Sequence, residues 1–146
     1  MSRRTSIVNK LVEKLKLIDG SGIFKSNLYG NAHAQLKFWD ECLGFPAIYV
    51  TPGPESREYH PGQFKWGFLS VCIKVYVKDP ETSQQQLEDL LEDIESVIDN
   101  NRVLVYDEVN NYETTEILIV SIVTDEGLLL PYGVGEVTIQ VRYPIM

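Results

Sequence analysis

Histidine and cysteine are both scarce in this chain of 146 residues, which contains two of each. Neither His33 nor His60 stands in the HxxxH, HExxH or HxH spacings of metal sites, and Cys42 and Cys72 are isolated from each other. The sequence therefore argues against a zinc site and against a disulfide framework. We expect no cofactor, while a divalent cation at a subunit contact stays an open alternative that the sequence does not place.

Long apolar runs and catalytic motifs are missing as well. No window reaches the roughly 20 apolar residues that a membrane helix needs, and Glu13 and Lys14 interrupt the basic N-terminus before a signal-peptide core forms. The GxxxxGKS/T, GxGxxG and GxSxG spacings do not occur. We therefore expect a single domain over residues 1–146, used in a cytoplasm-like compartment and with no visible active site.

Positive charge is scarce beyond the first part of the chain, and the net charge is −8. Residues 1–39 hold seven Lys or Arg against two acidic residues, whereas residues 40–146 hold six against nineteen. Because a grip on duplex DNA depends on Lys and Arg at the phosphates, the acidic body argues against a DNA-gripping protein. An acidic surface favours solubility, and it also suits a surface past which DNA must slide without sticking.

Two amphipathic helices are predicted. Ser6 has the character of an N-cap before apolar residues at helical spacing, and Gly20-Ser21-Gly22 would end that helix. Asp79-Pro80 predicts the start of a second helix that runs to about Asn100. Its apolar stripe consists of Leu87, Leu90, Leu91, Ile94, Val97 and Ile98.

The second predicted helix also carries six acidic residues and no Lys or Arg: Glu88, Asp89, Glu92, Asp93, Glu95 and Asp99. They lie off the apolar stripe, so we expect a solvated polar face. Like charges four residues apart destabilise a helix by roughly a few tenths of a kcal/mol per pair. A basic surface of a neighbouring copy, within residues 3–37, would relieve this repulsion.

Several segments carry β patterns. A long strand is predicted from Phe64, because apolar residues alternate along it through Leu69, Val71, Ile73, Val75 and Val77. Near the C-terminus Val137–Tyr143 alternates in the same way, whereas Ile117–Val123 is apolar at nearly every position, as expected of a strand buried on both faces. Phe45–Val50 and Val103–Tyr106 predict shorter strands.

The remaining segments are predicted as connections. Thr51–Gly62 holds three prolines and two glycines and is predicted as a long loop between two strands. Ile23–Asn31 suggests a short extended piece, and Asn31–Cys42 fits either a helix or an irregular strand. The order helix, strands, helix, strands predicts an α+β fold, with a mostly antiparallel β-sheet and two helices packed on one face.

Aromatic residues supply the only candidate site. Phe64, Trp66 and Phe68 stand at every second position, so one face of that strand begins with three large rings, and Tyr59 lies just before them. The rings fit either a packed sheet end or an edge that anchors a partner, since interface anchors favour Trp, Tyr and Phe. We take Tyr59, Phe64, Trp66 and Phe68 as a candidate subunit or tube interface, with no catalytic or metal-binding residues.

The order of these motifs resembles the tail terminator (tail completion) proteins of long-tailed bacteriophages. The resemblance runs through the N-terminal helix, Phe45–Val50 with its Pro/Gly loop, the long strand ending at Lys78 and the acidic helix. It continues through Ser121–Gly127, then Pro131-Tyr132-Gly133, then the final strand Glu136–Tyr143. One departure is Glu126, where the family often has a second glycine after Asp.

This resemblance implies a structural virion protein without enzymatic activity. Members of that family form a homo-hexameric ring on the head-proximal end of the tail tube, stop its polymerisation and present the docking surface for the capsid. The expected partners are further copies of the chain, the tail tube protein and a head completion or connector protein. DNA is expected only as passing cargo, no membrane is involved, and assembly takes place in the host cytoplasm.

Three rival functions stay open from the sequence. A head–tail connector or neck protein of similar fold would share the ring and the virion location. A tail tube subunit is disfavoured because tubes need a long β-hairpin, which the sequence does not indicate. A small hydrolase with a site assembled from His60, Asp125 and Glu126 is the third alternative.

Overall fold

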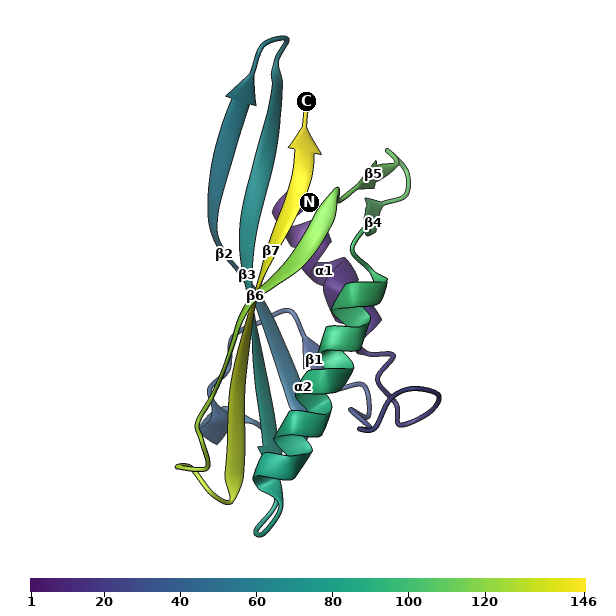
Figure 1. Ribbon diagram of the computed structural model, residues 1–146. Helices are drawn as coiled ribbons and strands as arrows, with labels where there is room; N and C mark the ends of the chain where they lie inside the picture. The colour runs from purple at the N-terminus through teal and green to yellow at the C-terminus, as the bar shows by residue number, and fades with distance from the viewer.

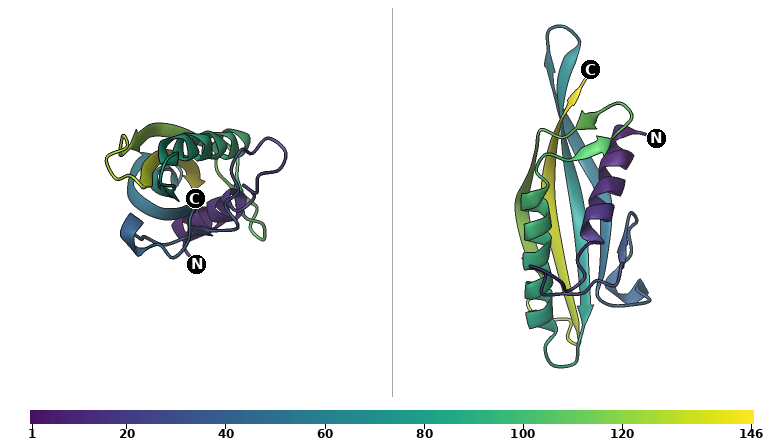
Figure 2. Two further views of the ribbon diagram at one scale, coloured as in Figure 1. Left: turned by 90° about the horizontal axis from the view of Figure 1, so that it is seen from below. Right: turned by 90° about the vertical axis from the view of Figure 1, so that its right-hand side faces the viewer.

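One twisted five-stranded sheet, with both helices against the same face, forms the body of the protein (Figures 1 and 2). The structure is a computed structural model that describes residues 1–146. The strand order is β1-β2-β3-β7-β6, and only β1 and β2 are parallel. The predicted α+β fold is confirmed. The elements are α1 (Arg3–Leu15), β1 (Ala32–His33), the 3-10 turn η1 (Trp39–Glu41), β2 (Ala47–His60), β3 (Phe64–Lys78), α2 (Ser83–Asn100), β4 (Val105–Asp107), β5 (Tyr112–Glu113), β6 (Glu116–Thr124) and β7 (Tyr132–Ile145).

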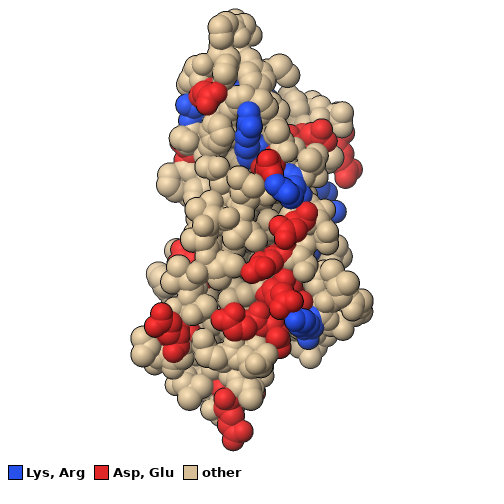
Figure 3. Space-filling view, in the orientation of Figure 1, with Lys and Arg blue, Asp and Glu red and all other residues tan.

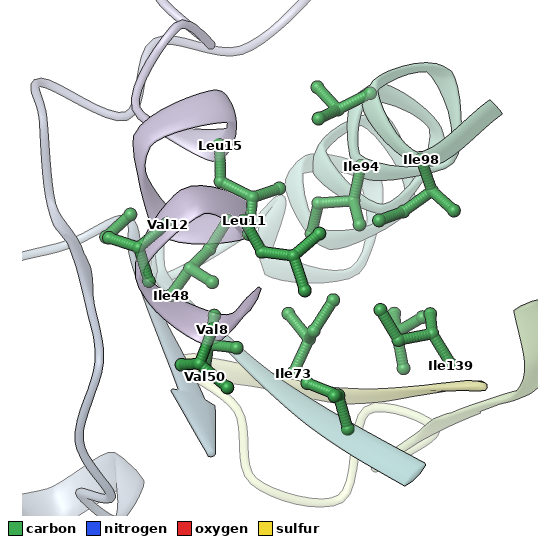
Figure 4. Close-up of a cluster of buried hydrophobic side chains, with 14 of the residues drawn as sticks. Val8, Leu11, Val12, Leu15, Ile48, Val50, Ile73, Ile94, Ile98 and Ile139 are labelled. Carbon is green, nitrogen blue, oxygen red and sulfur yellow. The ribbon is translucent and has the colours of Figure 1, made fainter. Parts of the chain in front are cut away.

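The core lies between the sheet and the two helices. The alternation predicted for β3 is confirmed, because Leu69, Val71, Ile73 and Val75 are all fully buried. They meet the apolar stripes of α1 and α2, as the close-up in Figure 4 shows for side chains of both helices and the sheet. Each fully buried aliphatic side chain stabilises the fold by about 1.5–3 kcal/mol relative to exposure, so this layer contributes most of the stability.

Both helices begin elsewhere than predicted. The N-cap of α1 is Ser2, whose hydroxyl accepts a hydrogen bond from the Thr5 amide, and Ser6 lies inside the helix. The carboxylate of Asp79 accepts the amides of Glu81 and Thr82 in a turn, so α2 starts only at Ser83. Ser and Asp accept amide hydrogen bonds equally well in turns and at caps, which is why sequence alone misplaces such starts. Neither helix is long and apolar enough to cross a membrane.

The prediction of a loop over Thr51–Gly62 is wrong. β2 continues to His60 and pairs with β3 up to the turn, so the segment is one arm of a long β-hairpin. The pairing is irregular between Pro52 and Glu55, where the prolines stand. Because β1 pairs only with Ile48 and Tyr49, the outer side of β2 carries no strand beyond that point. Proline lacks an amide donor and is tolerated on such an edge.

Residues 23–44 have little regular structure. The predicted extended piece at Ile23–Asn31 reduces to an isolated bridge between Asp19 and Asn27. After β1, which pairs with the edge of β2, the chain passes to the sheet face opposite the helices, which we call the open face, and there the hydroxyl of Tyr76 donates to the carbonyl oxygen of Lys37 at 2.6 Å. There Trp39 and Phe45 pack against Tyr132, with ring centroids 4.9 and 5.6 Å away. This small cluster closes one end of the open face.

Asp93 departs from the solvated face predicted for the acidic residues of α2. It is 2% exposed, and its carboxylate accepts the backbone amides of Lys25 and Ser26 at 2.8–3.1 Å. The bonds join α2 to the connection that follows α1, nearly 70 residues away along the chain. A buried carboxylate satisfied in this way fixes an otherwise irregular segment.

We therefore expect Asp93→Ala to lower the free energy of unfolding by about 1–3 kcal/mol, because two buried amides lose their acceptor. Urea denaturation followed by circular dichroism measures this change. The control is Asp99→Ala on the same helix, where the side chain is exposed and the change should stay within about 0.5 kcal/mol. Equal effects of the two substitutions would contradict the structural role of Asp93.

Candidate assembly surfaces

The β2–β3 hairpin is the most prominent feature of the molecular outline. Its end extends beyond the helices and beyond the other strands, on the side of the molecule where both chain termini lie (Figure 1). The turn at its tip uses Gly62 and Gln63 with positive φ angles of 81° and 63°. The opposite end of the sheet carries the β3–α2 turn and the β6–β7 connection (Figure 1).

One face of the hairpin carries the predicted row of rings. Phe64 and Trp66 meet edge to face with centroids 5.0 Å apart. The guanidinium of Arg142 on β7 lies 4.0 Å from the Trp66 ring centroid and 5.8 Å from that of Phe68. The three rings are half-buried, so each keeps surface available for a partner. Cation–π contacts of this kind are worth about 0.5–2 kcal/mol and order the rings.

Tyr59 does not join these rings. It pairs in register with Lys65, whose ammonium nitrogen lies 5.3 Å from the Tyr59 ring centroid. Because side chains alternate along a strand, Lys65 and Tyr59 lie on the face opposite Phe64 and Trp66. Tyr59 is 72% exposed. The four candidate residues thus occupy both faces of one hairpin, and their role at an interface stays a prediction.

The base of the hairpin is tied to the last strand. The side chain of Glu55 is only 5% exposed, and its carboxylate accepts a hydrogen bond from Nε of Arg57 at 2.7 Å. It also accepts a hydrogen bond from the hydroxyl of Tyr143 on β7. Burial, together with the Glu55 carboxylate, raises the pKa of Tyr143 above its ordinary value, which keeps the hydroxyl protonated as a donor. Arg4 of α1 adds a bond to the carbonyl oxygen of Gly53.

β6 is the second candidate surface, and here the prediction of a strand buried on both faces is wrong. β6 is the edge strand of the sheet and pairs only with β7. Ile117 is buried, but four other apolar residues are 38–61% exposed: Leu118, Val120, Ile122 and Val123. No charged residue interrupts the strand between Glu116 and Asp125. Exposed edge strands normally carry charges, proline or a bulge that prevents pairing with another chain, and β6 has only the irregularity between Ile119 and Ser121.

An acidic groove lies beside this edge. It has a volume of about 510 Å³ and separates α2 from β6, with Ile122 on the β6 side and acidic residues of α2 on the other. Its carboxylates come from Glu88, Asp89, Glu92 and Glu95. Of these four, only Glu92 forms an ion pair, with the ammonium nitrogen of Lys25 at 2.9 Å from its carboxylate oxygen. Figure 3 shows the acidic side chains as a band over α2.

The residues considered for a hydrolytic site are not brought together. His60 lies next to the hairpin tip, where its Nε2 is 2.6 Å from the Glu58 carboxylate. Asp125 and Glu126 lie in the β6–β7 connection at the other end of the sheet. No group of three or more His, Cys, Asp and Glu residues is arranged to hold a metal ion, and Cys42 and Cys72 are free thiols.

Comparison with known proteins gives a consistent result. The whole chain, residues 1–146, matches the family model described as Bacteriophage Tail Tube Terminator Protein. The tail tube terminator protein p142 of Escherichia phage T5 is 40% identical over 152 residues, covering 98% of this chain and 94% of that protein. A chain in a solved structure titled "Virion of native gene transfer agent (GTA) particle" has a TM-score of 0.67 at 9% identity, with 99% of this chain and all of that chain covered. That likeness concerns the fold alone.

The tie at the hairpin base leads to a stability prediction. Tyr143→Phe removes one donor from the buried Glu55 carboxylate and should lower the free energy of unfolding by about 1–2 kcal/mol. The control is Tyr29→Phe, because Tyr29 is 74% exposed and should tolerate the change within about 0.5 kcal/mol. Urea denaturation at neutral pH measures both.

The same residue also affects the dependence of stability on pH. The pKa of Tyr143 is raised in the folded state, so the folded protein keeps a proton that the unfolded chain releases above about pH 10. The contribution of this group is therefore complete below about pH 10 and is lost as the pH rises further. Between about pH 9 and pH 11, the free energy of unfolding should therefore fall less for Tyr143→Phe than for the wild type. An identical loss in both proteins would contradict this assignment.

Proposed function

This chain belongs to the bacteriophage tail tube terminator family, and we propose that it caps the head-proximal end of the tail tube as a homo-oligomeric ring, most simply a hexamer. Its family is structural rather than enzymatic, so the chain is a structural component of the virion tail. In the proposed role the ring ends polymerisation of the tube and then presents the docking surface for the capsid. The hexameric state, the head-proximal position, assembly in the host cytoplasm and the connector partner are parts of this proposal.

The projecting hairpin is the observation that carries the proposal. A protein that ends polymerisation must occupy the surface where the next tube subunit would add. It therefore needs a segment that reaches beyond its own body along the tube axis. The β2–β3 hairpin is the segment of this chain that projects beyond the body, and it presents partly exposed rings on one face and Tyr59 on the other. Large aromatic side chains are the residues that most often anchor protein interfaces.

The opposite end of the sheet is the proposed capsid side. The β6–β7 connection there exposes Leu128 and Leu130, at 85% and 56%, beside Asp125 and Glu126. Exposed apolar residues within an acidic rim are typical of a surface that a further protein covers. The acidic balance of residues 40–146 supports DNA as passing cargo, because a surface poor in cations releases phosphates readily.

The structure changes the argument about one rival function. The absence of a long hairpin was the reason to disfavour a tail tube subunit, and that reason is removed because the hairpin exists. The family match over the whole chain is what favours a terminator over a tube subunit or a neck protein. The hydrolase alternative loses its geometric basis, since His60 and Asp125 lie at opposite ends of the sheet.

Native mass spectrometry over a concentration series, with and without Mg²⁺, tests the proposed ring. A discrete closed oligomer supports the proposal, and six copies is the expected number. A mass that changes with Mg²⁺ would place a divalent cation at the subunit contact. If the isolated protein is monomeric, the same measurement is made on capped tail tubes, and copies that remain unassociated there would overturn the ring.

We predict that the hairpin is required for capping. Tyr59→Ala and Trp66→Ala should each weaken binding to the end of tail tubes by at least about tenfold, as expected for an aromatic anchor. Tyr29→Ala is the control, because Tyr29 is as exposed as Tyr59 but lies in the connection after α1. Electron microscopy of tube length and pull-down with purified tubes measure capping. Tubes capped normally by both hairpin variants would contradict the proposed contact.

A further inference from the structure

The two long sides of the molecule carry opposite charge. α2 packs over β3, β7 and β6, whereas α1 packs over β1, β2 and β4, so each helix flanks one edge of the sheet. α2 contains six acidic residues and no cation, while Arg3–Lys16 contains five cations and one acid. The acidic helix therefore borders the β6 edge, and the basic helix borders the β1–β2 edge.

Unpaired charges sit where each edge is hollowed. At the β6 edge, Glu88 and Glu95 line the acidic groove without an ion-pair partner. At the β1 edge, Lys16 lines a groove of about 420 Å³ between α1 and β1, and Lys37 lines a second hollow of about 260 Å³ on the open face. Neither lysine has a salt bridge within the chain. The β1 edge also carries acids: Glu13, which is paired with Lys10, lines the groove of Lys16, and η1 adds Asp40 and Glu41. Lys16 and Lys37 are the free charges there that a copy of the acidic groove would neutralise.

The apolar surfaces at the two edges also match. β6 leaves Leu118, Val120, Ile122 and Val123 exposed over an unpaired backbone, and nothing in the chain covers them. At the β1 edge, Leu43 lines the hollow of Lys37 and is 96% exposed, and Leu36, next to Lys37 in the chain, is 51% exposed. A sheet edge with unpaired backbone groups and apolar side chains is the usual template for addition of another chain.

Charge decides how two such edges can meet. Pairing β6 with a second β6 in a two-fold dimer would place two acidic α2 helices and their grooves together, and like charges oppose that contact. Pairing β6 with the β1 edge places the acidic groove against Lys16 and Lys37. A contact between two different surfaces of one chain is head-to-tail, and it closes into a ring when its rotation divides the circle.

We propose that the β6–α2 edge of one copy docks against the β1–α1 edge of a second copy of this chain, and that this contact builds the ring. The inference rests on the proposed function and adds the surface and its polarity. It accounts for an apolar strand that is left exposed at a sheet edge and for the segregation of charge along the chain. The hairpin lies outside this contact and remains free for the tube.

The first test places a charge on the exposed edge. Val120→Lys should reduce the association of copies by at least about tenfold, because the ammonium group would have to be buried at the contact. Val109→Lys is the control: it is the same change at a residue 94% exposed in the β4–β5 turn. Association is measured by sedimentation velocity and native mass spectrometry, on capped tubes if the free protein is monomeric. Thermal unfolding should be unchanged in both variants, since both side chains face solvent in one copy.

The second test reverses the charges on both sides. Glu88→Lys with Glu95→Lys should weaken association, and so should Lys16→Glu with Lys37→Glu. A chain that carries all four changes should associate within a few-fold of the wild type, because the two edges are again complementary. Carbodiimide cross-links between Lys16 of a heavy-isotope copy and Glu88 or Glu95 of a light copy would locate the contact directly.

The outcomes separate this inference from the function on which it rests. Wild-type protein that caps tubes as a ring, while Val120→Lys assembles equally well, overturns the edge contact and leaves the function intact. Rings that form with Val120→Lys but no longer cap tubes would assign β6 to the tube protein and also overturn the inference. The inference is also overturned if the variant with all four charge reversals associates no better than the weaker of the two double variants. Wild-type copies that never associate overturn both.

Discussion

The pairing of β3 along its whole length with β2 on one side and β7 on the other is the constraint on which the rest of the structure depends. The pleat sends Leu69, Val71, Ile73 and Val75 to the helices and their neighbours in sequence to the open face. A slip of one residue in either pairing would exchange the two faces and expose the core, so the register is strongly specified. Both helices and the long hairpin take their positions from this strand.

A sheet built on a central strand has to end at two edges, and this protein treats the two differently. The β1 edge is short and flanked by Lys16 and Lys37, whereas β6 is longer, apolar and flanked by acids, with one irregularity between Ile119 and Ser121. A symmetric pair of edges would favour two-fold dimers. Two unlike edges favour a repeated contact in one direction, and such a contact gives a ring or a filament. In the proposed capping role, closure of the repeated contact into a ring is what separates this protein from a subunit that polymerises.

Local periodicity was enough to predict the elements that carry the core. The alternation of β3 and β7 and the apolar stripe of α2 are confirmed, because each reflects burial against elements of the same chain. The prediction of a loop over Thr51–Gly62 was wrong because it relied on the prolines and glycines within the segment. What makes the segment a strand is its pairing with β3, which the local sequence does not record. The burial of Asp93 was missed for the same reason, since its amide partners at Lys25 and Ser26 are far away in sequence. Tyr59 was grouped with the rings by proximity, although its strand turns it to the other face.

The prediction for β6 failed in a more informative way. A strand apolar at nearly every position is expected to be buried on both faces, and in one copy of the chain it is not. An apolar pattern alone does not distinguish burial by the chain itself from burial by a partner. β7 pairs with both β6 and β3, and Tyr143 on β7 holds the base of the hairpin. The direction of the hairpin is therefore fixed relative to the β6 edge, so a contact that sets the angle between copies would also set the spacing of the hairpins around the tube.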